Sequence, residues 1–175
     1  MNPETLQKLT SSRWLVPAMA MAAESEGFRL AALLDRLGTS RSMTRRVVDR
    51  LVAFGWLAPN PGHGHPLRPE YVPTDEGRRI GSWCGDVMAV RRRLGLEPAQ
   101  LGRWALPVLG GLGPEWRRFS ELEQSLDPIT PRALSSALKQ LIGHRLVARR
   151  LQESFPPSAV YGATDRGRLL AATAA

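Results

Sequence analysis

The sequence predicts a mainly α-helical protein with small β-hairpins, an α+β fold made of two copies of one unit. Three observations predict it. The chain aligns with itself at a constant offset, apolar residues follow helical spacing through most of each copy, and each copy contains short β-rich segments bounded by turn residues. With 175 residues, 43% of them hydrophobic, the chain is long enough for one domain or for two small ones.

An offset of 90 residues aligns the two halves, with a one-residue adjustment near Leu37 and Leu126. The matching pairs are Arg13-Trp14 with Arg103-Trp104, Pro17 with Pro107, Tyr71 with Tyr161, Thr74-Asp75 with Thr164-Asp165, and Gly77-Arg78 with Gly167-Arg168. Self-similarity at a fixed offset indicates a repeated structural unit. We therefore expect a first domain at 1–78, a connector helix at 79–97 and a second domain at 98–175.

The second copy has the clearer helix signals. We expect helices at 104–112 and 119–126, a third helix beginning at Pro131, strands at 146–151 and 159–163, and a closing helix at 166–172 capped by Thr164 and Asp165. Thr130 is a good N-cap, and proline is favoured at the first helical position. Apolar residues at helical spacing define the buried face of the third helix: Leu134, Ala137, Leu138, Leu141 and Ile142.

The first copy repeats this order. We expect helices from Trp14, at 30–37 and at 42–54, strands at 56–59 and 71–73, and a cap at Thr74-Asp75. The inward residues of its third helix are Val47, Val48, Leu51 and Val52. Three helices followed by a two-stranded hairpin is the order of a winged helix-turn-helix, whose third helix enters the DNA major groove while the hairpin reaches the flanking backbone. The sequence thus predicts a tandem winged helix-turn-helix.

The second copy resembles the HxlR-type transcriptional regulators of the MarR-like winged-helix group. The residues that carry the resemblance are Arg118-Phe-Ser-Glu-Leu122, Ile129-Thr-Pro-Arg132 through Leu141, Leu146-Val147, Pro156-Pro157, and Val160 through Gly167. The first copy is a diverged version, in which Leu30-Ala-Ala-Leu33 replaces Phe-Ser-Glu-Leu and Ser42-Met43 replaces Pro131-Arg132. The resemblance implies a regulator that acts as a homodimer on palindromic DNA, usually with one winged helix per chain, so two copies depart from the family pattern.

The outward face of each third helix, together with the hairpin, supplies the candidate DNA-binding residues. These are Ser42, Arg45, Arg46, Asp49, Arg50, Arg68, Arg132, Ser135, Ser136, Lys139, Arg149 and Arg150. Arginine pairs bidentately with guanine, and serine bonds to base edges or phosphate. Asp49 is repelled by phosphate unless it accepts from cytosine or pairs with a neighbouring arginine. A polar outer face is also normal for any solvated helix.

Net charge gives weaker evidence. The formal charge is +8 with a pI near 11.1, and 22 of the 24 basic residues are arginines, which favours an anionic partner. The abundance of Ala, Gly, Pro and Arg can also reflect genome composition. We expect Arg91-Arg92-Arg93 and Arg117-Arg118 to be solvated charge runs. No apolar run is long enough for a membrane helix and the N-terminus lacks a signal-peptide pattern, so we expect a cytoplasmic protein.

The sequence does not predict an enzyme, a cofactor or a metal site. It contains no nucleophile motif, phosphate loop or cofactor fingerprint. His63 and His65 supply only two of the four ligands of a structural zinc site. The lone Cys84 is expected to be a small buried hydrophobic residue rather than a redox sensor.

The connector, readable as one helix from Asp75 to Leu94, is expected to pack between the copies. Trp14, Met19, Trp83, Met88 and Trp104 are then candidates for lining a site for a small aromatic or apolar effector, although such residues also make ordinary core. The predicted function is a repressor that binds an operator in double-stranded DNA, as a monomeric pseudo-dimer or a homodimer, with recognition helices about 34 Å apart. The alternative is a protein-interaction or architectural module without sequence-specific DNA binding.

Overall fold

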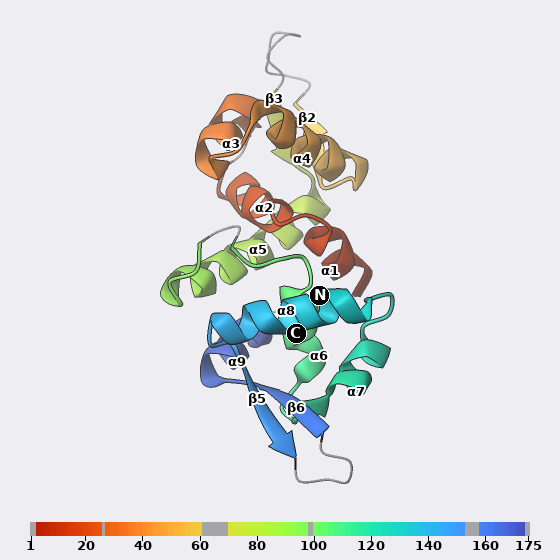
Figure 1. The fold of residues 1–175 in the computed structure, drawn as a ribbon. Coiled ribbons are helices and arrows are strands. Elements are labelled where there is room, and N and C mark those ends of the chain that lie inside the picture. Colours follow the sequence, from red (N-terminus) through yellow and green to blue (C-terminus); the bar gives the residue numbers. More distant parts are fainter. Residues whose placement is uncertain (1–2, 26, 61–69, 98–99, 153–157, 174–175) are drawn as a thin grey trace. The chain divides into compact units, whose positions relative to one another are not determined.

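A computed structural model describes residues 3–25, 27–60, 70–97, 100–152 and 158–173 (Figure 1). The chain divides into two compact units, one of residues 14–89 and one that combines residues 90–175 with residues 1–13. We call them the 14–89 unit and the 90–175 unit. Residues 1–13, which we expected in the first domain, cluster with the second unit because helix α1 (Pro3–Thr10) contacts helix α6 (Ala105–Leu112).

The 14–89 unit consists of helices and one small antiparallel sheet. Its elements are α2 (Leu15–Glu24), β1 (Phe28–Arg29), α3 (Leu30–Leu37), α4 (Arg41–Ala53), β2 (Leu57–Pro59), β3 (Glu70–Pro73) and most of α5 (Asp75–Arg93). The strand order is β1-β3-β2, with Phe28 opposite Tyr71 and Leu57 opposite Pro73. The connector helix expected at 79–97 is the later part of α5 and ends earlier than expected, at Arg93.

The 90–175 unit repeats that order of elements. After α6 come β4 (Arg117–Arg118), α7 (Phe119–Ser125), α8 (Pro131–Gly143), β5 (Val147–Gln152), β6 (Ser158–Ala163) and α9 (Asp165–Ala172). The sheet order is β4-β6-β5, so the last strand of each sheet in sequence lies between the other two. The mainly helical α+β class predicted from the sequence is confirmed, and most helix ends lie within one residue of the expected positions.

Each sheet has three strands, not the two expected from the sequence. The additional strands, β1 and β4, are two residues long, which is too short for alternation of apolar and polar residues to reveal them. Arg117 pairs with Tyr161 and Arg118 with Val160. Arg117-Arg118 is therefore a strand beside the hairpin rather than a loose charged run, although the side chain of Arg118 remains exposed.

The third helices bury the faces that the sequence predicted. In α8 the side chains of Leu134, Ala137, Leu138 and Leu141 are buried and Ile142 is half-buried. In α4 the side chains of Val47, Val48 and Leu51 are buried, Val52 is half-buried, and Thr44 is buried with its hydroxyl donating to the carbonyl oxygen of Ser40 at 3.0 Å. Both helices thus leave a polar face outside.

Equivalent hydroxyls cap the two helices. The Thr130 side chain accepts from the N–H of Ala133, and the Ser40 side chain accepts from the N–H of Met43, both at 3.2 Å. Helix α4 therefore begins at Arg41, one residue before the expected Ser42. This corrects the sequence alignment at that point, because Arg41-Ser42, not Ser42-Met43, occupies the place of Pro131-Arg132.

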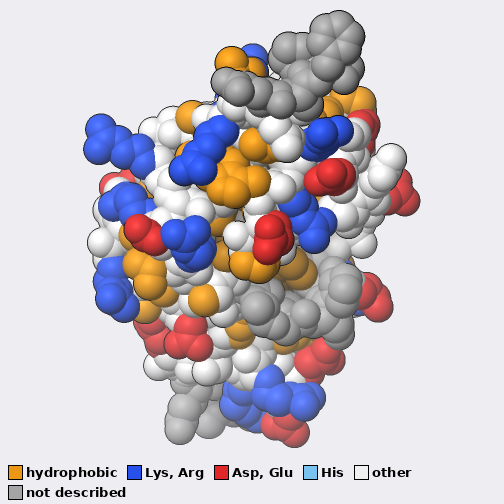
Figure 2. Space-filling model, turned by 90° about the horizontal axis from the view of Figure 1, so that it is seen from below, with side chains coloured by type: hydrophobic (Ala, Val, Ile, Leu, Met, Phe, Trp, Pro, Cys, Tyr) orange, Lys and Arg blue, Asp and Glu red, His pale blue; other side chains and the backbone are white. Residues whose placement is uncertain are grey.

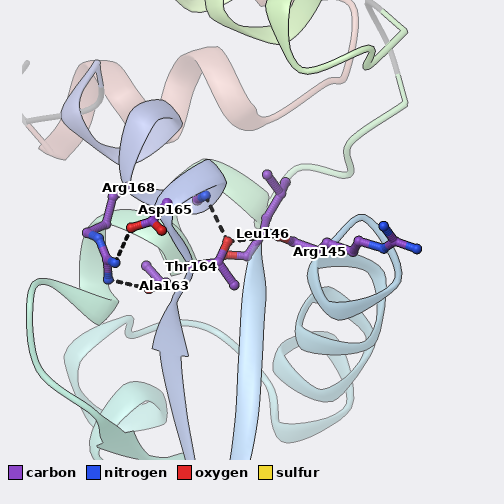
Figure 3. Close-up of polar contacts among 7 residues, drawn as sticks. Arg145, Leu146, Ala163, Thr164, Asp165 and Arg168 are labelled. Atoms are coloured by element: carbon purple, nitrogen blue, oxygen red, sulfur yellow. Dashed lines mark hydrogen bonds and ion pairs between the residues drawn. The ribbon is translucent and has the colours of Figure 1, made fainter.

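A hydrogen-bonded junction joins the central strand of each sheet to the next helix. In the 90–175 unit, the Thr164 hydroxyl donates to the carbonyl oxygen of Arg145 at 2.8 Å and accepts from the N–H of Gly167 at 3.1 Å (Figure 3). Asp165 pairs with Arg168 beside it. The 14–89 unit has the same contacts from Thr74 to the Gly55 carbonyl oxygen and the Gly77 N–H, at 2.8 and 3.0 Å.

Helix α5 is continuous from Asp75 to Arg93, as its apolar spacing predicted. Ile80, Cys84 and Val87 are buried, so the expected burial of Cys84 is confirmed. Arg91 is only 4% exposed, so the prediction that it belongs to a solvated charge run is wrong, whereas Arg92 and Arg93 are exposed. Within the described residues, no helix has both the length and the hydrophobicity required to span a membrane.

Candidate nucleic-acid interface

The outer face of α8 carries two cations and small polar side chains. Arg132, Ser136 and Lys139 are exposed, and Ser135 is half-buried. The helix holds them in place because its opposite face is core and its first turn is capped by Thr130 with Pro131 at the first position. Rigid placement matters for base recognition, since bidentate contacts to base edges depend on direction as well as distance. This face offers donors for guanine and for phosphate.

The outer face of α4 is more highly charged. The five residues predicted there are all exposed: Ser42, Arg45, Arg46, Asp49 and Arg50. Nε of Arg45 bonds to Oδ1 of Asp49 at 3.1 Å, one helical turn away. The sequence raised the problem that phosphate would repel an unpaired Asp49. The ion pair meets this condition, because the Asp49 carboxylate is paired with a neighbouring arginine. It also occupies Arg45, which leaves Arg46 and Arg50 as the arginines of this face that form no ion pair among the described residues.

The two outer faces carry different residues at equivalent positions. With Ser40 and Thr130 as matched N-caps, Asp49 stands where the other helix has Lys139, and Arg45 stands where it has Ser135. The carboxylate of Asp49 repels phosphate, whereas the ammonium of Lys139 attracts it. The faces of α4 and α8 therefore present different donor patterns to any common partner.

Two further candidate residues lie on strand β5. In the antiparallel pairing of β5 with β6, Arg149 lies opposite Tyr161 and Arg150 lies opposite Val160. Both arginine side chains are exposed. Figure 2 shows the molecule from the side on which β5 and β6 lie in Figure 1; Lys and Arg side chains are spread over this face, with Asp and Glu between them. The third predicted hairpin residue, Arg68, lies outside the described residues, as do His63 and His65.

Sequence reasoning missed Trp116, which takes part in the same surface. The guanidinium carbon of Arg150 lies 4.0 Å from the centre of its ring, and 36% of Trp116 is exposed. A tryptophan directly before a pair of arginines was the available signal, but its exposure and its contact with Arg150 depend on the pairing of three strands. Leu151, the next residue of β5, is 72% exposed.

A cavity of about 870 Å³ lies within the 90–175 unit, between α1, α6, the end of α7 and α9. Its mainly apolar lining includes Leu6, Thr10, Trp104, Pro107, Leu126 and Ala172. A cavity of this size matches the range of small-molecule sites, roughly 300–1,000 Å³. Of the five residues predicted to line an effector site, Trp104 lines this cavity.

The other four predicted effector residues belong to the 14–89 unit. Met19 is fully buried, and Trp14, Trp83 and Met88 are half-buried. Around the cavity of the 90–175 unit, the Arg103 guanidinium carbon lies 4.8 Å from the Trp104 ring centre. Glu4 pairs with Lys8 at 2.7 Å, and this hydrogen bond and the positive charge lower the pKa of Glu4. The rim of the cavity therefore carries fixed charges of both signs.

Comparison with known proteins finds a match for one part of the chain. Residues 101–174 match the family model described as HxlR-like helix-turn-helix. The matched range covers α6 to α9 and excludes the 14–89 unit. It contains α8 and the β5–β6 hairpin, the elements whose residues carry the resemblance to the HxlR-type regulators.

Two curated relatives agree with this match. The chain is 36% identical over 67 residues to a protein of Fusobacterium mortiferum named as the regulatory protein MalR, covering 38% of this chain and 63% of that protein. It is 34% identical over 70 residues to a protein of Halalkalibacterium halodurans named as an HTH-type transcriptional regulator, covering 39% and 62%. The chain thus spans somewhat less than two thirds of the length of each relative.

Two solved structures are also similar. One is described as a MarR-family transcriptional regulator from Enterococcus faecalis V583, with 27% identity, coverage of 55% of this chain and 76% of that chain, and a TM-score of 0.39. The other, described in the same way, is from Porphyromonas gingivalis W83, with 23% identity, coverage of 46% and 74%, and a TM-score of 0.38. Among the described residues, no group of three His, Cys, Asp or Glu side chains is placed to hold a metal ion.

Proposed function

We propose that this chain is a DNA-binding transcriptional regulator, with α8 in the major groove and the β5–β6 hairpin against the flanking backbone. The observation that carries the proposal is the exposed face of α8, where Arg132, Ser136 and Lys139 stand on a helix anchored by core on its other side. The HxlR-like match over residues 101–174 and the regulator names of the two relatives support it.

The positions of Arg132 and Lys139 on α8 suit two different kinds of DNA contact. Arg132 is one residue from the start of the helix, and recognition helices contact base edges mainly through their N-terminal residues. A bidentate arginine–guanine pair discriminates against the wrong base by about 1–3 kcal/mol. Lys139 lies two turns further along, where an ammonium is suited to phosphate, and phosphate contacts orient the protein without reading sequence. We assign base reading to Arg132 and backbone contact to Lys139.

The 14–89 unit is proposed to be a second winged helix that arose by duplication. Its strand order, its Ser40 cap and its Thr74 junction match those of the 90–175 unit. One chain would then act as a pseudo-dimer on an operator with two unequal half-sites, as a monomer or as a homodimer. The Arg45–Asp49 ion pair favours backbone contact over base reading for α4.

We further propose repression as the effect on transcription, and a small aromatic or apolar effector as the signal. A chain bound across a promoter excludes other proteins from the same stretch of duplex. The cavity beside Trp104 supports an effector, because its lining is mainly apolar and its size fits one flat ligand. A reporter fused to the DNA upstream of the chain's own gene would show higher expression when the gene is deleted; lower expression would mean activation.

DNA binding is tested by selecting duplexes of about 30 base pairs from a randomised library with the intact chain and then measuring the affinity for the selected sequence. Arg132→Ala should relax base preference at one position. Lys139→Ala should weaken binding to all sequences and make the salt dependence shallower by about one unit. Arg79→Ala, which removes an exposed arginine from α5, is the control and should change neither. A chain that selects no sequence even at low salt would favour the protein-interaction module.

A further inference from the structure

The sheet of the 90–175 unit carries a stacked cluster made by three residues from three adjoining segments. Trp116 directly precedes β4, Gly162 lies on the central strand β6, and Arg150 lies on β5. Arg117 pairs with Tyr161, so Trp116 stands one position further along, beside Gly162. A Cβ atom on Gly162 would lie 2.9 Å from the ring atoms Cδ2 and Cε2 of Trp116. The absence of a side chain at Gly162 is therefore what lets the indole ring lie on the strand.

The ring also holds a cation over it. The Arg150 guanidinium carbon is 4.0 Å from the ring centre, within the range of a favourable cation–π contact. Arg150 forms no salt bridge within the described part of the chain. A guanidinium stacked by its face keeps the N–H groups of its edge available, and that edge matches the geometry of a phosphate. The side chain is thus held in place while its charge stays exposed.

The equivalent place in the 14–89 unit is built differently. There the pair Phe28–Tyr71 corresponds to Arg117–Tyr161, so Gly27 corresponds to Trp116 and Val72 to Gly162. Asn60 stands in the place of Arg150, and its Nδ2 donates to Oε2 of Glu70 at 2.8 Å. In the 14–89 unit the glycine, Gly27, directly precedes β1 and the larger residue, Val72, lies on β3, which is the reverse of the 90–175 unit. The 14–89 unit therefore has neither an indole ring nor a guanidinium at this place. The two units therefore differ at this position in charge as well as in shape.

We propose that Trp116 is a positioning residue, whose ring, seated on Gly162, holds the Arg150 guanidinium ready to contact a phosphate of bound DNA. This inference rests on the proposed DNA-binding function and deepens it by naming what fixes the hairpin on the backbone. A long arginine side chain loses rotamer freedom when it is immobilised on binding. Stacking on Trp116 removes part of that freedom before DNA arrives, so the contact forms at a lower entropic cost. The 14–89 unit, with Gly27 and Asn60 at the equivalent places, has no such stacked pair there.

A double-mutant cycle tests the coupling between the two residues. The probe is a fluorescein-labelled duplex of about 30 base pairs, both the library-selected sequence and a random one, titrated with the intact chain at about 50 to 200 mM KCl. Arg150→Ala should weaken binding to both duplexes by roughly tenfold and make the salt dependence shallower by about one unit. Trp116→Leu should weaken binding by about threefold in the wild-type background and by nothing in the Arg150→Ala background.

Matched variants separate positioning from folding. Trp116→Phe keeps a ring and should retain most of the affinity, and Gly162→Ala, which displaces the ring, should behave like Trp116→Leu. Arg149 is the control, because neighbouring residues of a strand point to opposite faces. Loss of Arg149 should add to loss of Trp116 without coupling. Thermal unfolding of each variant checks that the 90–175 unit stays folded.

The outcomes distinguish this inference from the proposed function. If Trp116→Leu weakens binding equally with and without Arg150, or if Arg150→Ala changes neither affinity nor salt dependence, the positioning role is wrong and DNA binding stands. If Arg150→Ala relaxes base preference at one position, the arginine reads a groove and the phosphate contact is wrong. A wild-type chain that binds neither duplex at low salt would overturn the proposed function, and this inference with it.

Discussion

Gly167 lies so close to the backbone of Leu146 that a Cβ atom on it would be 2.0 Å from the Leu146 carbonyl oxygen. That oxygen also accepts the N–H of Thr164, at the junction where β6 leads into α9. In the 14–89 unit, a Cβ atom on Gly77 would lie 1.9 Å from the Trp56 carbonyl oxygen, beside Thr74. Both units have the same close contact between a helical glycine and the carbonyl of the residue just before a strand of the sheet, β5 or β2.

We predict that Gly167→Ala and Gly77→Ala each lower the free energy of unfolding by about 2–4 kcal/mol. The atom met by the new methyl group is backbone, so relief requires a shift of the helix away from the sheet. Urea denaturation followed by circular dichroism measures the change. Gly143→Ala, where no heavy atom lies within 4 Å of the added Cβ, is the control and should change stability by less than about 1 kcal/mol. Equal effects at Gly143 and Gly167 would contradict the assigned contact.

The caps of the two third helices provide a second prediction. Thr130→Ala and Ser40→Ala should each destabilise the protein by about 1 kcal/mol, because the N–H of Ala133 or Met43 loses its acceptor. Thr130→Ser keeps the hydroxyl and should stay close to wild type. Thermal denaturation of the three variants measures the difference. A Thr130→Ser variant as unstable as Thr130→Ala would show that the methyl group, not the cap, stabilises this turn.

Asp49 should limit the affinity of α4 for DNA. Asp49→Ala removes a carboxylate and releases Arg45, so binding to a random duplex should strengthen several-fold and become steeper in salt by about one unit. Stability should change by less than about 0.5 kcal/mol, since both side chains are more than half exposed. Fluorescence anisotropy at several salt concentrations measures the affinity. Asp86→Ala, on the exposed side of α5, is the control of equal charge; the same gain at both positions would indicate net charge alone.

The cavity beside Trp104 should bind a flat aromatic molecule. Suitable probes are 1-naphthoate and the neutral 1-naphthol. Each should quench tryptophan fluorescence in a saturable way, and Trp104→Leu should remove most of that quenching. Ala171→Phe places a ring in the cavity and should weaken probe binding by at least about tenfold. Leu169→Ala changes an exposed residue of α9 that does not line the cavity, and it should bind the probe normally. Binding unchanged by Ala171→Phe would place the probe elsewhere.

Much of the fold followed from local signals in the sequence. The Thr130-Pro131 start of α8 and the apolar spacing of α4 and α8 were read correctly, because a cap and one buried helix face involve residues within two or three turns. The outward placement of Arg132, Lys139 and Arg46 followed from the same periodicity. The ion pair of Arg45 with Asp49 is also local, one turn apart, and was among the options that the sequence left open.

Contacts between distant residues account for what sequence reasoning missed. Strands β1 and β4 are two residues long and exist because a neighbouring strand pairs with them. Helix α1 joins the 90–175 unit because it contacts α6, about a hundred residues later, and so completes a cavity whose place the sequence did not predict.

The amino-acid sequence alone was enough to define most of the helices, the cap of α8 and the order of helices and hairpin in each copy, because those features depend on hydrogen bonds and apolar spacing between near neighbours. The tertiary structure decided that Arg91 is buried and that the ring of Trp116 lies against Gly162 and contacts Arg150. These arrangements depend on which strands and helices meet after folding, since a ring stacks on a glycine only when strand pairing brings the two together.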